Sequence, residues 1–106
     1  MVSMKDIREV TDRIADRFRP QRIILFGSHA RGTAAPDSDV DLLVVMSFEG
    51  HPARKAGEIR SAIESSFPVD VIVRDPQTLR ERLDMDDPFV REILHAGKVL
   101  YEASDG

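Results

Sequence analysis

Two aspartates spaced one residue apart lead directly into an apolar run, in the stretch GSHARGTAAPDSDVDLLVV that runs from Gly27 to Val45. On an extended strand, side chains two residues apart point to the same face, with their Cα atoms roughly 7 Å apart. Asp39 and Asp41 would then present two carboxylates that can hold a divalent ion between them. The alternative is a solvated strand entry. The adjacent Leu42 disfavours it, because burial and a nearby like charge both penalise an unpaired carboxylate.

A third aspartate interrupts the apolar segment VDVIV at residues 69–73. Strand propensity and burial both favour a hydrophobic side chain at that position, so Asp70 needs a chemical partner. If this strand lies beside the one that contains Asp41, the two carboxylates can face the same side. Three carboxylates repel one another without a cation, and their oxygens are ligands that suit Mg²⁺ or Mn²⁺. A salt bridge from Asp70 to an arginine is the alternative.

A glycine-serine corner follows the short apolar run RIILF at residues 22–26. Gly27 permits close approach to the backbone, and a helix that begins at Ser28 directs its first N–H groups toward an anion such as phosphate. Ser28 acting only as a helix N-cap is the alternative. Arg31, one turn later, can donate to phosphate or pair with a surface aspartate. Phosphate donors beside metal ligands indicate phosphoryl transfer from a nucleoside triphosphate, with two ions about 3.5–4 Å apart.

Hydrophobic periodicity and turn residues predict the helices around these residues. Two amphipathic helices are expected, one that carries Ile7 to Phe18 and ends at Pro20, and one marked by Ala56, Ile59, Ile63 and Phe67. Asp-Pro pairs at 75–76 and 87–88 predict an N-cap and a first helical residue for two further helices, the second of which ends at Gly97.

Short β-branched and aromatic runs predict the strands. They are expected at residues 22–26, 40–46, 69–73 and 98–102, with a helical turn at 28–31 closed by Gly32 and a loop at 47–52. The strand at 40–46 is apolar on both faces after Asp41, which is typical of a central strand covered on both sides. The order of elements predicts an α/β or α+β fold in which helices flank a small sheet.

Length and composition are those of an ordinary globular chain. The 106 residues fit one domain, residues 1–106, and their net charge of −4 has mixed signs throughout, which favours neither a membrane nor direct nucleic-acid binding. No apolar run approaches the ~20 residues of a membrane span, and the charged N-terminus is unlike a signal peptide, so we expect a cytoplasmic protein. There is no cysteine, and the scattered His29, His51 and His95 receive no role.

The stretch GSHARGTAAPDSDVDL resembles the G-S-x-A-R-G-x-x-x-x-x-S-D-x-D-L signature of the minimal nucleotidyltransferases, which belong to the DNA polymerase β-like nucleotidyltransferase superfamily. The resemblance extends to Asp70 and to the segment FVREILHAGKVLYE. It implies a mixed sheet with flanking helices, in which Asp39 and Asp41 bind two Mg²⁺ ions. Asp70 would complete one metal site and help to deprotonate the acceptor hydroxyl. Gly27 and Ser28 would hold the triphosphate, with Arg31 nearby.

Many members of this family are antitoxins paired with a HEPN-domain ribonuclease toxin. The resemblance therefore implies an enzyme that transfers AMP from ATP to a tyrosine of that partner. Two other functions remain open: an antitoxin that neutralises the HEPN toxin by binding alone, and a small-molecule nucleotidyltransferase of the antibiotic-modifying type. The second is disfavoured because no further domain for a substrate is apparent. The acceptor and the choice of nucleotide are left open by the residues themselves.

Overall fold

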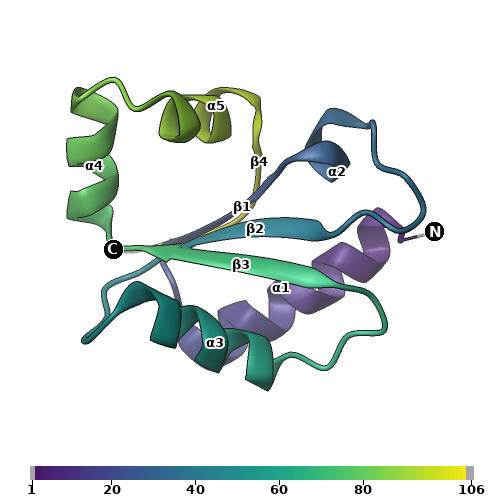
Figure 1. Cartoon of the computed structure of the whole chain (residues 1–106). Helices are drawn as coiled ribbons and strands as arrows, with labels where there is room; N and C mark the ends of the chain where they lie inside the picture. The colour runs from purple at the N-terminus through teal and green to yellow at the C-terminus, as the bar shows by residue number, and fades with distance from the viewer. Residues whose placement is uncertain (1, 105–106) are drawn as a thin grey trace.

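The computed structural model describes residues 2–104, which form a four-stranded sheet with helices on both faces (Figure 1). In chain order the elements are α1 Met4–Phe18, β1 Arg22–Phe26, α2 Ser28–Arg31, β2 Val40–Val45, α3 Pro52–Ala62, β3 Val69–Arg74, α4 Pro76–Asp84, α5 Pro88–Ala96 and β4 Lys98–Glu102. None of the helices in this part of the chain is both long and apolar enough to cross a membrane.

The sheet is mixed, as expected. Its strand order is β3-β2-β1-β4, with β2 and β3 parallel and β1 antiparallel to both of its neighbours. In the central strand β2, the four residues from Leu42 to Val45 are each at most 1% exposed. This burial confirms the interpretation of an apolar run covered on both sides.

The two faces of the sheet carry separate cores. Helices α1 and α3 cover one face, and α4 and α5 lie over the other (Figure 1). Val40, Leu42 and Val44 point into the α1–α3 core, whereas Leu43 and Val45 point into the α4–α5 core. Because side chains alternate along a strand, the face of Leu43 is also the face of the residue two positions before it.

Both Asp-Pro pairs cap helices as predicted. Asp75 accepts a hydrogen bond from the backbone N–H of Thr78 at 2.8 Å, and Asp87 accepts one from that of Phe89 at 2.9 Å. Gly97 ends α5 as predicted, but its φ of −75° is open to any residue. A Cβ there would lie 2.3 Å from the carbonyl oxygen of Ile93, so close packing is what requires glycine.

The second amphipathic helix is shorter than predicted, because it ends at Ala62 and does not reach Phe67. Ile63 is already extended, and the Ser65 hydroxyl donates to the carbonyl of Phe67 and accepts from its N–H, which holds a turn just before Pro68. Ile63 and Phe67 still pack against the α1–α3 core. A helical spacing of buried residues therefore continued past the helix itself. Smaller shifts end β2 at Val45, extend β3 to Arg74 and begin α3 at Pro52.

Candidate active site

Asp41 and Asp70 are neighbours across the sheet. They are Cα partners in the parallel register of β2 and β3, whose backbones are about 4.8 Å apart. Two residues further along, Leu43 and Ile72 are also partners and both contribute to the α4–α5 core. Asp41 and Asp70 therefore share that face of the sheet, with Asp41 half-buried and Asp70 exposed.

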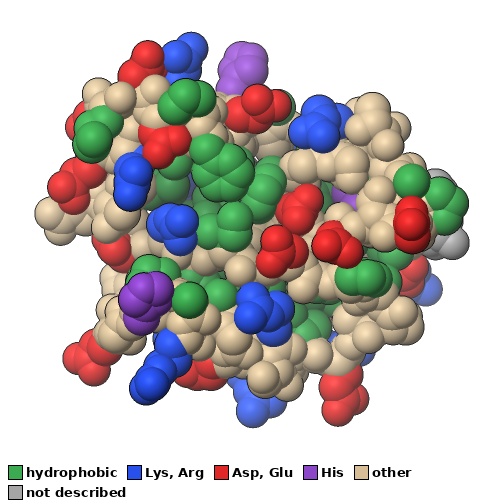
Figure 2. Space-filling model, viewed as in Figure 1, with side chains coloured by type: hydrophobic (Ala, Val, Ile, Leu, Met, Phe, Trp, Pro, Cys, Tyr) green, Lys and Arg blue, Asp and Glu red, His purple; other side chains and the backbone are tan. Residues whose placement is uncertain are grey.

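Asp39 lies immediately before β2 and is exposed. Figure 2 shows acidic side chains gathered at the N-terminal ends of β2 and β3, beside a hydrophobic patch. Within residues 2–104, no group of three His, Asp or Glu side chains is arranged to hold a metal ion. The donors nevertheless fit a hard cation, because Asp41 and Asp70 are in-register carboxylates on one face and no ion pair with an arginine occupies Asp70 among the described residues.

Gly27 is in direct contact with the Asp41 carboxylate. It follows Phe26, the β1 partner of Asp41, and its φ of 75° and ψ of −156° are conformations that essentially only glycine adopts. A Cβ at this position would lie 2.3 Å from Oδ2 of Asp41. The carboxylate therefore packs against the backbone at the start of α2, where the first helical N–H groups have no acceptor inside the helix.

The structure changes the interpretation of Ser28. The N-cap of α2 is Gly27, with no side-chain cap, and Ser28 is the first helical residue. The alternative in which Ser28 acts only as a helix N-cap is therefore wrong, and its half-buried hydroxyl does not cap the helix. Arg31 is the exposed last residue of α2 and forms no ion pair within residues 2–104, so the surface-bridge alternative is not observed either.

His29 links the two halves of the site, although its sequence position gave no reason to assign it a role. Its Nε2–H donates to the carbonyl oxygen of Ser38 at 3.2 Å, which ties α2 to the residue just before Asp39. The contact joins residues nine positions apart across an irregular loop. Hydrophobic periodicity carries no information about such a contact.

A pocket of about 330 Å³ opens beside Gly27 and Arg31. Phe26 and Phe89 line it and pack edge-to-face, with ring centroids 5.8 Å apart and an interplanar angle of 89°. Phe89 is 48% exposed. The volume of the pocket lies at the lower end of the range for small-molecule sites, and its aromatic walls suit an aromatic ring. From the sequence, Phe89 was only part of an expected helix, so the pocket was missed.

The environment of Asp41 raises the pKa of its carboxyl above the ordinary value of 3.8. Burial is the largest cause, and the charges of Asp70 and Asp39 add to it, while those of His29 and Arg31 act in the opposite direction. The acidic groups thus act on one another electrostatically across the site.

This raised pKa predicts a pH-dependent cost of folding. Asp41 binds its proton more tightly in the folded than in the unfolded chain, so stability falls as the pH rises from 3.8 through the folded-state pKa. With divalent cations chelated, Asp41→Asn should therefore be more stable than the wild type at neutral pH, and this difference should disappear below pH 3.8. Urea unfolding at both pH values measures it.

Asp37→Asn is the matched control, because Asp37 is an exposed aspartate of the loop that precedes β2. It should leave the unfolding midpoint unchanged at both pH values. A gain in stability for Asp41→Asn that is the same above and below pH 3.8 would contradict the electrostatic origin.

Comparison with known proteins gives concordant results. Residues 7–101 match the family described as "Nucleotidyltransferase domain". A relative in Methanocaldococcus jannaschii, named "Putative protein adenylyltransferase MJ0604", is 27% identical over 99 residues, which cover 92% of this chain and 96% of that protein.

Two solved structures share the fold. One is the crystal structure of a protein from Sulfolobus solfataricus, with a TM-score of 0.66 and 24% identity over 97% of this chain and 83% of that one. The other is a toxin-antitoxin complex with AMP-PNP, in which the matched chain has a TM-score of 0.55 and 25% identity over 97% of this chain and 76% of its own length.

Proposed function

Because this chain belongs to the nucleotidyltransferase domain family, we propose that it transfers AMP from ATP to a hydroxyl group, and that this hydroxyl belongs to a tyrosine of a partner HEPN-domain toxin. The observation that carries the proposal is the in-register pair Asp41 and Asp70, directly beside the glycine that opens α2. Carboxylates and backbone N–H groups thereby meet where a triphosphate and its counter-ions would bind.

In the proposed reaction, the acceptor oxygen bonds to the α-phosphorus of ATP and the bond to the bridging oxygen of the β-phosphate breaks, so that pyrophosphate leaves. Asp39 and Asp41 would hold two Mg²⁺ ions, or Mn²⁺, and Asp70 would complete one of the two sites. When bound, these ions would neutralise the leaving pyrophosphate and activate the hydroxyl. Asp70, exposed at the start of β3, accepts the proton of the incoming hydroxyl.

The start of α2 serves the phosphates. Gly27, lacking a side chain, lets a phosphate oxygen approach the N–H groups of the first turn, and Arg31 adds a positive charge that no described carboxylate neutralises. The Ser28 hydroxyl is an additional donor. The neighbouring pocket with Phe26 and Phe89 accepts an aromatic ring, either of the nucleotide or of the acceptor.

Two of the similar proteins support a protein acceptor in a toxin-antitoxin pair. One is named for protein adenylyltransferase activity, and the other is a chain of a toxin-antitoxin complex with AMP-PNP. We also propose that this protein is an antitoxin that uses ATP and acts in the cytoplasm.

Labelled ATP and Mg²⁺ test the proposal directly, with the protein encoded by the neighbouring gene as the acceptor if that protein has a HEPN domain, as the proposal expects. We expect one AMP per acceptor, located on a tyrosine by mass spectrometry, and no transfer when that tyrosine is replaced by phenylalanine. Label that appears on neither the HEPN protein nor any other polypeptide would remove protein adenylylation as the function.

An antitoxin that acts by binding alone is the competing function. In its favour, no three acidic or histidine side chains of residues 2–104 are arranged as a metal site. A variant with Asp39, Asp41 and Asp70 all changed to asparagine separates the two. If that variant protects cells from the toxin as well as the wild type does, neutralisation needs no catalysis.

A further inference from the structure

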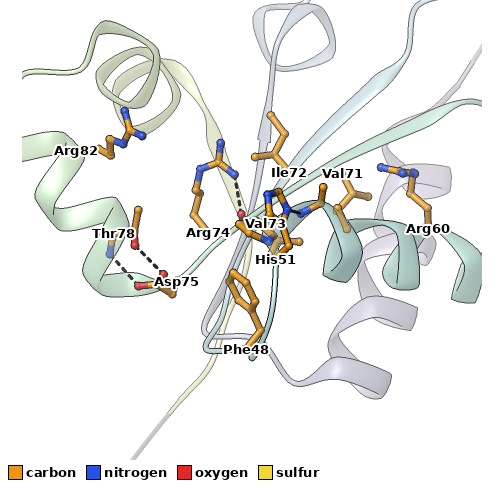
Figure 3. Close-up of a pocket in the computed structure, with 13 residues that line it drawn as sticks. Phe48, His51, Arg60, Val71, Ile72, Val73, Arg74, Asp75, Thr78 and Arg82 are labelled. Atoms are coloured by element: carbon orange, nitrogen blue, oxygen red, sulfur yellow. Dashed lines mark hydrogen bonds between the residues drawn. The ribbon is translucent and has the colours of Figure 1, made fainter.

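A second pocket, of about 490 Å³, lies along the outer edge of the sheet (Figure 3). β3 is the last strand on that side, so one of its edges has no neighbour among the described strands. The pocket is lined by Val71, Ile72, Val73 and Arg74 in succession. Consecutive strand residues point to opposite faces, so a pocket that touches all four follows the strand edge.

The hydrogen bonds of β3 identify which backbone groups face outward. The carbonyl oxygens of Pro68 and Arg74 accept from N–H groups on the β2 side, those of Val40 and Met46. Lateral direction alternates along a strand, so even-numbered residues of β3 face β2 and Val69, Val71 and Val73 face outward. The Val73 carbonyl indeed accepts a hydrogen bond from Arg74 Nη1 at 2.8 Å, outside the sheet.

The pocket is positively charged. Arg60 on α3 and Arg82 on α4 lie on opposite sides of it, with Arg74 between them (Figure 3). Within residues 2–104, Arg60 and Arg74 form no ion pair, whereas Arg82 lies 3.5 Å from a carboxylate oxygen of Asp87.

The acidic lining residue is Asp75, and its carboxylate is already engaged. One oxygen accepts from the Thr78 N–H at 2.8 Å and the other from the Thr78 hydroxyl at 2.7 Å. His51 is an N-cap whose Nδ1 accepts from the N–H of Ala53, which requires an unprotonated Nδ1. Asp75 keeps its negative charge but is turned toward Thr78, so the cations of the pocket without a carboxylate partner are Arg60 and Arg74.

We propose that this pocket binds an extended, acidic segment of a partner protein, which adds to the sheet as a strand next to β3. The outward N–H groups of Val71 and Val73 and the carbonyl of Val71 bond to its backbone, while the Val73 carbonyl stays bonded to Arg74. Carboxylates on the two faces of the added strand meet Arg60 on the α3 side and Arg74 on the α4 side. A free strand edge matches the repeating N–H and C=O groups of an extended peptide backbone, which favours a protein ligand. Binding here does not require the transferase activity.

The pocket lies on the same strand as one carboxylate of the candidate active site. Asp70 and Arg74 are four residues apart on β3, about 13 Å along the strand. A segment held at the edge therefore ends close to the carboxylates of the candidate active site, so a partner docked there is brought near them.

A short peptide with consecutive glutamates between valines, which presents carboxylates on both faces, is the probe, and a peptide of equal length with lysines in place of the glutamates is its charge control. Titration of the labelled peptides into the whole protein, followed by fluorescence anisotropy, should show binding of the glutamate peptide alone, weakened by salt. Amide exchange measured by NMR should slow at Val71 and Val73 on binding. N-methylation of alternate peptide residues on the bonding side should abolish the interaction.

Charge reversal tests the arginines. Arg60→Glu, on the exposed surface of α3, and Arg74→Glu should each weaken binding by about tenfold or more, because a carboxylate then faces a carboxylate. Arg80→Glu on α4 is the matched control, since Arg80 is exposed and does not line the pocket, and it should leave binding unchanged. Circular dichroism verifies that each variant is folded.

The proposal would be overturned by equal binding of both peptides, by an effect of Arg80→Glu as large as that of Arg60→Glu, or by binding without slower exchange at Val71 and Val73. Displacement of the glutamate peptide by a single-stranded oligouridylate would also overturn it. The pocket would then be a nucleic-acid site.

Discussion

Asp41→Asn is expected to lower the rate of AMP transfer by more than about 100-fold, because losses of 10- to 100-fold already follow from changing groups that only support a metal ligand. Asparagine keeps the size of the side chain and removes its charge at the centre of the site. Asp41 is the half-buried member of the acidic group and contacts the backbone of Gly27. Transfer of labelled AMP to the partner, with Mg²⁺ present, measures the effect.

The exposed Asp37 again provides the control, and Asp37→Asn should transfer at the rate of the wild type. Loss of activity in Asp41→Asn cannot be attributed to unfolding if that variant is the more stable one without cations, as its electrostatics predict. Transfer that continues undiminished in Asp41→Asn would contradict the mechanism.

Stabilisation by ligand provides a second test of Asp41→Asn. A ligand at 100 times its dissociation constant stabilises a folded protein by about 2.7 kcal/mol. Mg²⁺ with ATP should therefore raise the melting temperature of the wild type clearly and that of Asp41→Asn much less. Equal shifts in both proteins would mean that the nucleotide binds elsewhere.

Gly27→Ala is expected to abolish transfer and to destabilise the fold by about 2–4 kcal/mol. The new Cβ would lie 2.3 Å from the Asp41 carboxylate, in a backbone conformation that costs other residues roughly 1–3 kcal/mol. Either the carboxylate or the start of α2 must move, and both belong to the proposed phosphate and metal sites. Transfer assays and urea unfolding measure the two effects.

Gly32→Ala provides the comparison, because Gly32 also has a positive φ, 76°, but no atom within 4 Å of a new Cβ. It should cost about 1–2 kcal/mol and leave transfer largely intact. A double-mutant cycle isolates the contact: in an Asp41→Ala background, Gly27→Ala should destabilise the protein less than it does in the wild type. Equal destabilisation in the two backgrounds would leave backbone strain as the whole effect.

Local chemistry made much of the architecture predictable. The Asp-Pro pairs that begin α4 and α5 act within one helical turn. The apolar runs of β1 and β2 indicate buried strands by composition alone. The Gly27-Ser28 corner and the Asp39-x-Asp41 pair lie in a single stretch of chain, so their proximity needs no long-range folding. The roles of these residues in catalysis stay predictions.

The sequence predicted the ends of helices less well where two local preferences competed. The periodicity from Ala56 to Phe67 predicted a helix that the Ser65 turn and Pro68 end early, because burial repeats at helical spacing even where the backbone is extended. Ser28 is a good N-cap by type, yet Gly27 occupies that position. The Asp41 carboxylate, on another strand, packs against Gly27 and leaves no room there for a side chain.

By itself, then, the sequence determined the elements, the acidic residues and the family pattern of this protein, since each depends on neighbours within a few positions. Only the tertiary structure decided that Asp41 and Asp70 share one face, that His29 reaches the Ser38 carbonyl, and that β3 forms an open, arginine-lined edge. The physical reason is strand register. A shift of β3 by one residue would turn Asp70 to the opposite face of the sheet, and the packing of two separate cores is what prevents it.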